Sequence, residues 1–185
     1  METGVLSMKY YVIDAFTDEV FRGNPAGVCL LEQEMPDELM QKIAFENNLA
    51  ETAFLLRRDN TYDLRWFTPE VEIDLCGHGT LATAFVVMNY VEAGLQYIEF
   101  QTKSGVLSVA RNADYYMMNF PSRMPVATKK TNLLEEALGC KVLETYQSRD
   151  LLVIVEDEET VANLNVNYDL LSQNSKGAGV GDIYV

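Results

Sequence analysis

The chain has 185 residues, of which 48% are hydrophobic and 23% are charged, and its formal net charge is −14. This length suits one domain or one and a half small ones, and the acidic balance argues against nucleic-acid and anionic-membrane partners, which need clustered lysine and arginine. No run of about 18 apolar residues offers a membrane-spanning helix. Three widely spaced cysteines favour reduced thiols in a cytoplasm, and with a single histidine they argue against a structural zinc site.

The first 120 residues predict many strands and two helices. A first helix is expected over 36–47, with acidic residues in its first turn, where they suit the helix dipole. A second helix, expected over 79–92, is apolar on nearly every face and must therefore be buried on all sides. Strands are expected over 9–16, 28–31, 49–56, 62–67, 71–74, 97–102, 105–111 and 115–120. A curved sheet wrapped around a helix satisfies this pattern.

The segment 21–27 joins the first two strands. Its Gly, Asn and Pro residues predict a turn with unusual backbone angles. Asn24 lies within it and has a side chain that can bind a ligand or cap the turn. A plain loop is the alternative, and the pattern alone does not separate the two.

Glu51 is one charge among apolar neighbours at the head of the strand 49–56. Desolvation raises the pKa of a carboxyl group, which is what a group that both donates and accepts a proton near neutrality requires. The alternative is a solvated glutamate at the rim of a sheet, because glutamate is usually exposed.

The stretch 74–80 precedes the apolar helix and brings together Cys76, the only histidine of the chain, His78, and two glycines, Gly77 and Gly79. Glycine lets the backbone approach a ligand closely, and the free N–H groups of a helix N-terminus favour a bound anion such as a carboxylate. A Gly-rich turn into an ordinary core helix is the alternative, since such turns are common false positives.

The section from 121 to 185 predicts shorter elements. A short amphipathic helix is expected over 133–138, strands over 142–147 and 151–156, a helical run after the acidic turn at 157–159, and a further helix over 169–173. A glycine-rich segment, 177–181, leads into the start of a strand at 182–185. Because no fully apolar helix occurs here, this section by itself predicts half a domain.

Five motifs in fixed order carry a family resemblance. They are Asp14-Ala15-Phe16, Gly23-Asn24-Pro25 and the segments 48–54, 65–69 and 72–80. Together they resemble the PhzF-like (phenazine biosynthesis protein PhzF) family of the diaminopimelate-epimerase fold. The resemblance implies an α+β fold in which a β-barrel-like sheet wraps around a central buried helix, with a first domain over 8–120, a partial and truncated second copy over 121–185, and an active site between domains.

The resemblance also implies cofactor-independent, metal-free isomerase or epimerase chemistry that moves a proton on a small carboxylate-bearing metabolite. Glu51 matches the family's acid/base glutamate, and the Gly-Asn-Pro loop that holds Asn24 matches one beside the site. Gly77 and His78 match a ligand-contacting pair, and the amides from Gly77 to Gly79 are expected to hold the developing anion. Cys76 matches a position where diaminopimelate epimerases carry an acid/base thiol, and it is expected to be secondary here.

One departure from the family pattern is large. Full-length members carry a second-half motif whose aspartate faces the first domain's glutamate, and no such motif occurs in this chain. A catalytically silent remnant that acts as a binding or oligomeric protein is therefore the alternative hypothesis. A half-barrel also leaves unpaired strand edges, and family members are often homodimers, so self-association is expected.

Overall fold

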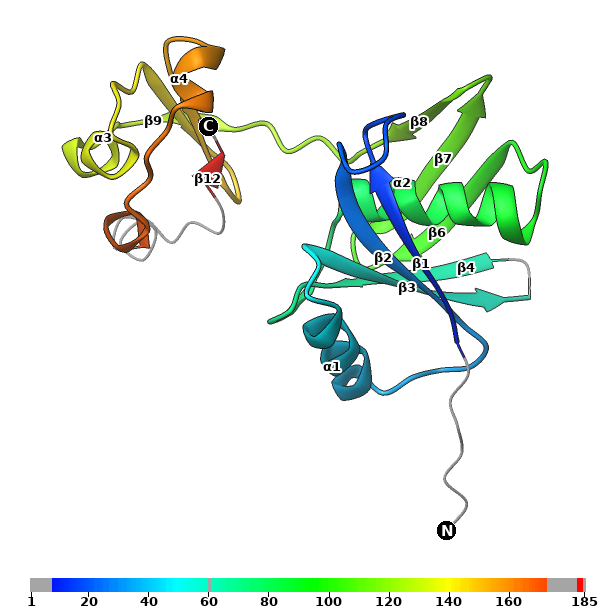
Figure 1. The fold of residues 1–185 in the computed structure, drawn as a ribbon. Coiled ribbons are helices and arrows are strands. Elements are labelled where there is room, and N and C mark those ends of the chain that lie inside the picture. Colours follow the sequence, from blue (N-terminus) through cyan, green and yellow to red (C-terminus); the bar gives the residue numbers. More distant parts are fainter. Residues whose placement is uncertain (1–7, 60, 173–182, 185) are drawn as a thin grey trace. The chain divides into compact units, whose positions relative to one another are not determined.

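A computed structural model describes residues 8–59, 61–172 and 183–184. The chain forms two compact units, Met1–Phe120 and Pro121–Val185 (Figure 1). Each unit has its own sheet and its own apolar core. No helix among the described residues is long and apolar enough to cross a membrane.

The first unit is built on one sheet. Its strands run in the order β1-β2-β3-β4-β6-β7-β8, and β5 pairs with β4. The β2–β3 and β4–β6 pairs are parallel and the others are antiparallel. The strand bounds are β1 Lys9–Ala15, β2 Asn24–Leu31, β3 Glu51–Arg58, β4 Thr61–Phe67, β5 Glu72–Ile73, β6 Tyr97–Thr102, β7 Gly105–Asn112 and β8 Tyr115–Asn119.

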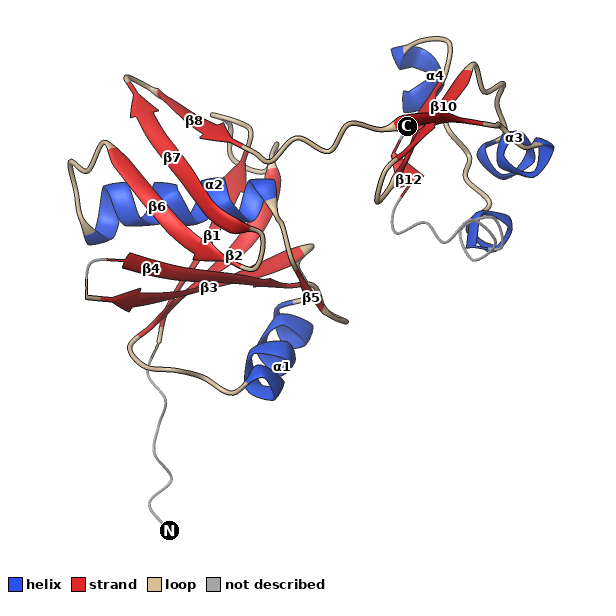
Figure 2. Cartoon of the chain, turned by 180° about the vertical axis from the view of Figure 1, so that it is seen from behind, coloured by secondary structure: helices blue, strands red, loops and turns tan. Residues whose placement is uncertain are grey.

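The apolar helix α2 (Gly77–Val86) lies within the curl of this sheet and continues into a π-helical turn, η1 (Val87–Val91) (Figure 2). Its small side chains pack against β2, and its last turns pack against aromatic and aliphatic residues of β4, β6 and β7. The α+β fold with a half-barrel sheet around a buried helix confirms the expectation from sequence. The helix begins two residues earlier than 79 because Cys76 caps it.

A second helix covers the other side of the sheet. It is α1 (Asp37–Asn47), and it buries Met40 and Ala44 against Phe54 and Phe67. Asn48 follows in the left-handed conformation, with φ of 50°, and ends the helix, as the sequence predicts. Helix α1 therefore supports β3, the strand that begins at Glu51.

The turn predicted over 21–27 is wrong from Asn24 onward. Strand β2 already begins at Asn24, and Pro25 pairs with Asp14 of β1. Strand β3 joins β2 only from Ala26 onward. Pro25 therefore lies where β2 has one neighbour, a position at which a missing N–H is tolerated.

The sheet does not close, because β1 and β8 are its two ends. A groove of about 790 Å³ lies where the end of β1, residues 81–85 of α2 and the β7–β8 turn meet. Two large apolar side chains that line it are exposed, Phe16 (70%) and Tyr115 (80%). Elsewhere on β1, Val12 is 54% exposed. The unpaired edges expected from sequence are therefore present in this unit.

The second unit is smaller. Its strands are β9 (Val126–Thr128), β10 (Glu144–Gln147), β11 (Leu151–Ile154) and β12 (Ile183–Tyr184), in the order β12-β11-β10-β9. Helix α3 (Asn132–Leu138) packs Leu134 and Leu138 against Val153, whereas α4 (Glu158–Ala162) buries no residue. The sequence did not predict the short strand β9. The predicted glycine-rich segment 177–181 lies outside the described residues.

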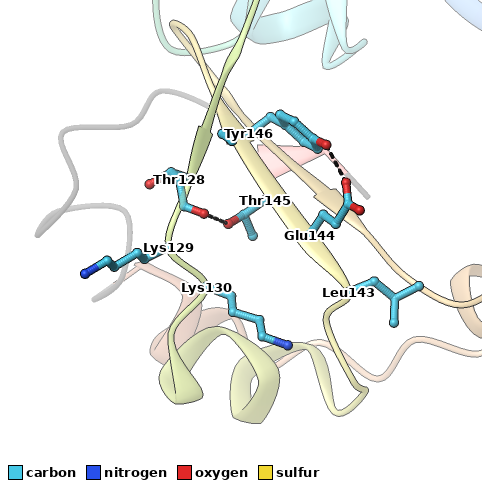
Figure 3. Close-up of a pocket in the computed structure, with 8 residues that line it drawn as sticks. Thr128, Lys129, Lys130, Leu143, Glu144, Thr145 and Tyr146 are labelled. Atoms are coloured by element: carbon cyan, nitrogen blue, oxygen red, sulfur yellow. Dashed lines mark hydrogen bonds between the residues drawn. The ribbon is translucent and has the colours of Figure 1, made fainter.

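A shallow pocket of about 450 Å³ lies along β9 and β10 (Figure 3). Two of its polar side chains bond within the pocket: Thr145 donates to the carbonyl of Thr128 at 3.0 Å, and Tyr146 donates to Glu144. Lys130 at its rim donates to the Val142 carbonyl at 2.8 Å. The residues singled out from the sequence as catalytic or substrate-binding do not line this pocket but lie in the first unit.

Candidate active site

Glu51 and the start of α2 meet because of the sheet register. Glu51 opens β3 beside Ala26 of β2, so its side chain lies at one end of the curled sheet. The chain from β5 enters α2 at the same end, and Ser104 fixes this approach by donating to the Asp74 carbonyl at 2.8 Å. Residues 27 positions apart in sequence, Glu51 and His78, therefore become neighbours.

The imidazole of His78 lies between a thiol and a carboxylate. Its Nε2 is 3.1 Å from Oε2 of Glu51, and its Nδ1 is 3.6 Å from Sγ of Cys76. The side chains of His78 and Glu51 are only 9% and 19% exposed. The structure thus brings together three of the residues singled out from the sequence and removes them largely from water.

Cys76 is the N-cap of α2. Its sulfur accepts a hydrogen bond from the Gly79 N–H at 3.4 Å. Burial, together with the nearby Glu51 charge, raises the pKa of the Cys76 thiol to about 12, although the Gly79 hydrogen bond opposes this shift. The thiol therefore stays protonated near neutral pH and is a poor nucleophile, because the thiolate is the reactive form.

Three buried polar atoms in the described part of the chain have no hydrogen-bond partner. They are Oε2 of Glu51, Nε2 of His78 and Nε1 of Trp66. The first two are close but not aligned for a hydrogen bond. Buried polar atoms without partners are rare in folded proteins and call for an explanation. A polar ligand that takes up these atoms is one such explanation.

Trp66 is the residue that the sequence reasoning did not assign to the site. It lies in β4 beside Ala53 and Ile73, 1% exposed, and packs in one cluster with Cys76. A buried tryptophan usually finds a partner for its N–H. Nothing in the sequence separates this tryptophan from an ordinary core residue, apart from its place in the 65–69 motif.

The two glycines at the start of α2 serve different purposes. A Cβ on Gly79 would lie 2.9 Å from Cδ1 of Trp66 and 3.0 Å from Sγ of Cys76, which is too close for either to stay in place. A Cβ on Gly77 would meet only the tip of the Phe120 ring, at 3.3 Å. Gly79 thus lets the thiol, the indole and the helix backbone pack tightly, whereas Gly77 tolerates more.

Asn24 is not among the residues that meet at this point. It is exposed and begins β2, two residues before Ala26, the register partner of Glu51. It therefore lies at the same end of the sheet as Glu51, and none of the described hydrogen bonds joins its side chain to the cluster of Glu51, Cys76 and His78. Its role stays a prediction.

The cluster of Glu51, Cys76 and His78 also carries the side-chain types that bind metal ions. Glu51, Cys76 and His78 each offer one ligand atom, and these atoms lie within 4.8 Å of one another. Zinc accepts all three ligand types, but it binds cysteine as the thiolate. The imidazole turns a different nitrogen to each neighbour. The arrangement therefore suits hydrogen bonding and proton transfer better than it suits a shared cation.

Comparison with known proteins identifies the family of the chain. The family model described as phenazine biosynthesis-like protein matches residues 13–183. The chain belongs to the phenazine biosynthesis-like (PhzF-like) family. The match includes Glu51 and the whole stretch from Cys76 into α2.

Individual relatives agree with this assignment. An uncharacterized isomerase of Pseudomonas aeruginosa is 47% identical over 159 residues, which are 86% of this chain and 61% of the relative. The crystal structure of a PhzF-family protein from Enterococcus faecalis is 48% identical, with a TM-score of 0.82, and the match covers 90% of this chain and 64% of that one.

A more distant solved structure is similar to this chain in fold alone. A predicted epimerase from Pseudomonas aeruginosa is 21% identical, with a TM-score of 0.76, over 96% of this PhzF-like chain and 69% of that chain. The chain spans less than two thirds of the length of the curated relatives that it matches at 47% and 41% identity.

Proposed function

We propose that this PhzF-like chain contributes the acid/base half of a cofactor-independent isomerase site, which moves a proton on a small carboxylate-bearing metabolite. Glu51 is the acid/base group. His78 and the backbone amides at the start of α2 hold the negative charge that develops on the substrate. The naming of a 47%-identical relative as an uncharacterized isomerase supports the reaction class.

The observation that carries the proposal is the pair of unpartnered, buried polar atoms, Oε2 of Glu51 and Nε2 of His78, 3.1 Å apart. Abstraction of a proton next to a carboxylate needs a base with little water around it and a donor for the resulting anion. Glu51 supplies the oxygen that takes the proton. Nε2 of His78, when it carries the ring proton, supplies a donor directly beside it.

The helix start supplies the second anchor. The N-terminal N–H groups of α2 have no intrahelical partners by geometry, and the helix dipole favours negative charge there. The Gly79 amide is already used by Cys76, which leaves the amides of Gly77 and His78 as the donors closest to the start of the helix. A substrate carboxylate bound at these amides would lie beside both Glu51 and His78.

The proposed chemistry balances without a cofactor. The Glu51 carboxylate takes a proton from the substrate carbon and becomes a carboxylic acid. The electron pair left behind spreads onto the adjacent carboxylate or conjugated system, where His78 and the amides hold it. Return of the proton to a different face or a different carbon gives the isomer.

The test is wash-in of solvent deuterium. The 185-residue chain is incubated in D2O with a panel of chiral amino acids and cyclic diene acids, and deuterium at carbon is followed by mass spectrometry. We expect exchange in at least one panel member, reduced at least about 100-fold by Glu51→Gln, which keeps the shape and removes the base. Glu46→Gln, at an exposed position of α1, is the matched control and should leave the rate unchanged.

The opposite result is equally clear. An absence of exchange across the panel in the wild-type chain, or equal exchange in the wild type and in Glu51→Gln, would overturn the proposed function.

A further inference from the structure

The single histidine of the chain has a different titratable neighbour at each ring nitrogen. Nδ1 faces Sγ of Cys76 at 3.6 Å, and Nε2 faces Oε2 of Glu51 at 3.1 Å. A neutral imidazole carries its proton on one nitrogen only, and the partner of the other nitrogen decides which. The two neighbours of His78 therefore determine what this ring can donate and where.

The hydrogen bonds of Cys76 limit the possibilities. The sulfur already accepts the Gly79 N–H at 3.4 Å. Because burial raises the pKa of this thiol to about 12, the sulfur also carries a hydrogen of its own near neutral pH. Nδ1 of His78 is the described acceptor within hydrogen-bond reach of that hydrogen. An imidazole nitrogen that accepts a hydrogen bond carries no proton, so the ring proton belongs on Nε2.

The carboxylate on the other side leads to the same conclusion. With the proton on Nδ1, the lone pair of Nε2 would point toward a carboxylate oxygen 3.1 Å away, which is a repulsive contact. With the proton on Nε2, the same contact is attractive. The carboxylate of Glu51 and the thiol of Cys76 therefore favour one tautomer from opposite ends of the ring.

We propose that Cys76 is a positioning residue, whose thiol donates to Nδ1 of His78 and so holds the imidazole in the Nε2–H form beside Glu51. The thiol neither attacks the substrate nor exchanges a proton with it. The catalytic consequence, which alone depends on the proposed function, is that the Nε2–H of His78 can donate a hydrogen bond next to the carboxylate of Glu51. The Nε2–H lies beside the Glu51 oxygen without being aligned to it, so it remains available to a substrate oxygen.

The experiment is a long-range 1H–15N correlation spectrum of the ligand-free chain at neutral pH. Because the chain has one histidine, the spectrum contains one imidazole and reports its tautomer without assignment by mutation. We expect the Nε2–H pattern in the wild type. A proton on Nδ1 of the wild-type ring would overturn the proposal, so the spectrum of the wild type is sufficient for this test.

Three variants sharpen the test. Cys76→Ala removes the donor and should give a mixture of both tautomers, whereas Cys76→Ser keeps a donor at a slightly greater distance and should retain the Nε2–H form. Cys140→Ala, at a half-buried thiol of the second unit, is the control and should leave the spectrum unchanged. A pure Nε2–H pattern in folded Cys76→Ala would show that Glu51 alone fixes the tautomer and would overturn the role of Cys76.

Failure of this inference is distinguishable from failure of the proposed function. The tautomer is read without substrate, so it can be as expected in a chain that catalyses no exchange. If exchange does occur, Cys76→Ala should lower its rate by the fraction of rings in the wrong tautomer, and Cys76→Ser should restore it. Exchange that is unaffected by Cys76→Ala would count against Cys76 while leaving Glu51 in its role.

Discussion

The two units place their helices differently, and the difference explains where the site lies. In the first unit, α2 lies within the curl of the sheet, and its N-terminus meets the buried side chains of His78 and Glu51. In the second unit, α3 and α4 are short, and their N-termini are capped by Thr131 and Asp157. Helix α2 is capped as well, by Cys76, but its start lies beside the buried, unpartnered atoms Oε2 of Glu51 and Nε2 of His78, whereas no such atom is found among the described residues at the starts of α3 and α4.

The largest structural effect should come from filling the tight space at the start of α2. Gly79→Ala would press a methyl group onto Trp66 and Cys76 at about 3 Å, and overpacking of this kind costs about 1–3 kcal/mol. Urea denaturation of the purified chain measures the loss. Gly77→Ala, which meets only the tip of the Phe120 ring, is the control and should cost less. Equal losses of unfolding free energy in the two variants would show that the close contacts of Gly79 with Trp66 and Cys76 do not determine the cost.

The next effect is acid sensitivity of the first unit. Hydrogen bonds from Arg65, at 2.7 and 2.8 Å, and from Lys103 hold the pKa of Glu72 below its ordinary value of 4.5. A carboxyl group whose pKa is lowered in the folded state stabilises the fold above its ordinary pKa, and this contribution is lost as the pH falls through the lowered value.

Glu72→Gln should therefore cost about 1–3 kcal/mol of unfolding free energy at pH 7 and progressively less below pH 4. Denaturation curves at several pH values measure this difference. The second unit offers the comparison, because a backbone hydrogen bond from Thr160 lowers the pKa of the exposed Asp157. Asp157→Asn should change the acid response of that unit less, since water screens the charge. A difference between the wild type and Glu72→Gln that stays constant from pH 7 to pH 3 would contradict the assignment.

The smallest effect is self-association through an open edge. Strand β1 is seven residues long and unpaired on one side, whereas the edge strand β9 of the second unit has three residues. Long apolar edges recruit other strands, and a lysine on the edge prevents this. We expect concentration-dependent association in sedimentation, weakened by Val12→Lys on β1 and unchanged by Val126→Lys on β9. A monomer at all concentrations would show that the edge of β1 is protected.

The sequence predicts the elements of the first unit well because their periodicities are local. The apolar helix and the strands around it can be predicted from patterns within each segment. Strand β9 could not be predicted, because its three residues after Pro125 are all exposed and show no alternation of apolar and polar side chains. The contact of Glu51 with His78 joins segments 27 residues apart, and only the family motifs pointed to it. The sequence could not predict that the N–H of Trp66 is unpartnered, because this depends on the absence of a hydrogen-bond acceptor among its neighbours in the fold.

Deuterium wash-in with Glu51 variants tests the central claim most directly. The account predicts exchange on a carboxylate-bearing panel member in the wild-type chain, at least about 100-fold slower exchange in Glu51→Gln, and slow exchange in Glu51→Asp, whose carboxylate is drawn back by one methylene. The exposed Glu46→Gln control should match the wild type. Exchange at the wild-type rate in both Glu51 variants would contradict the account, because the proton would then be moving without the carboxylate that faces His78.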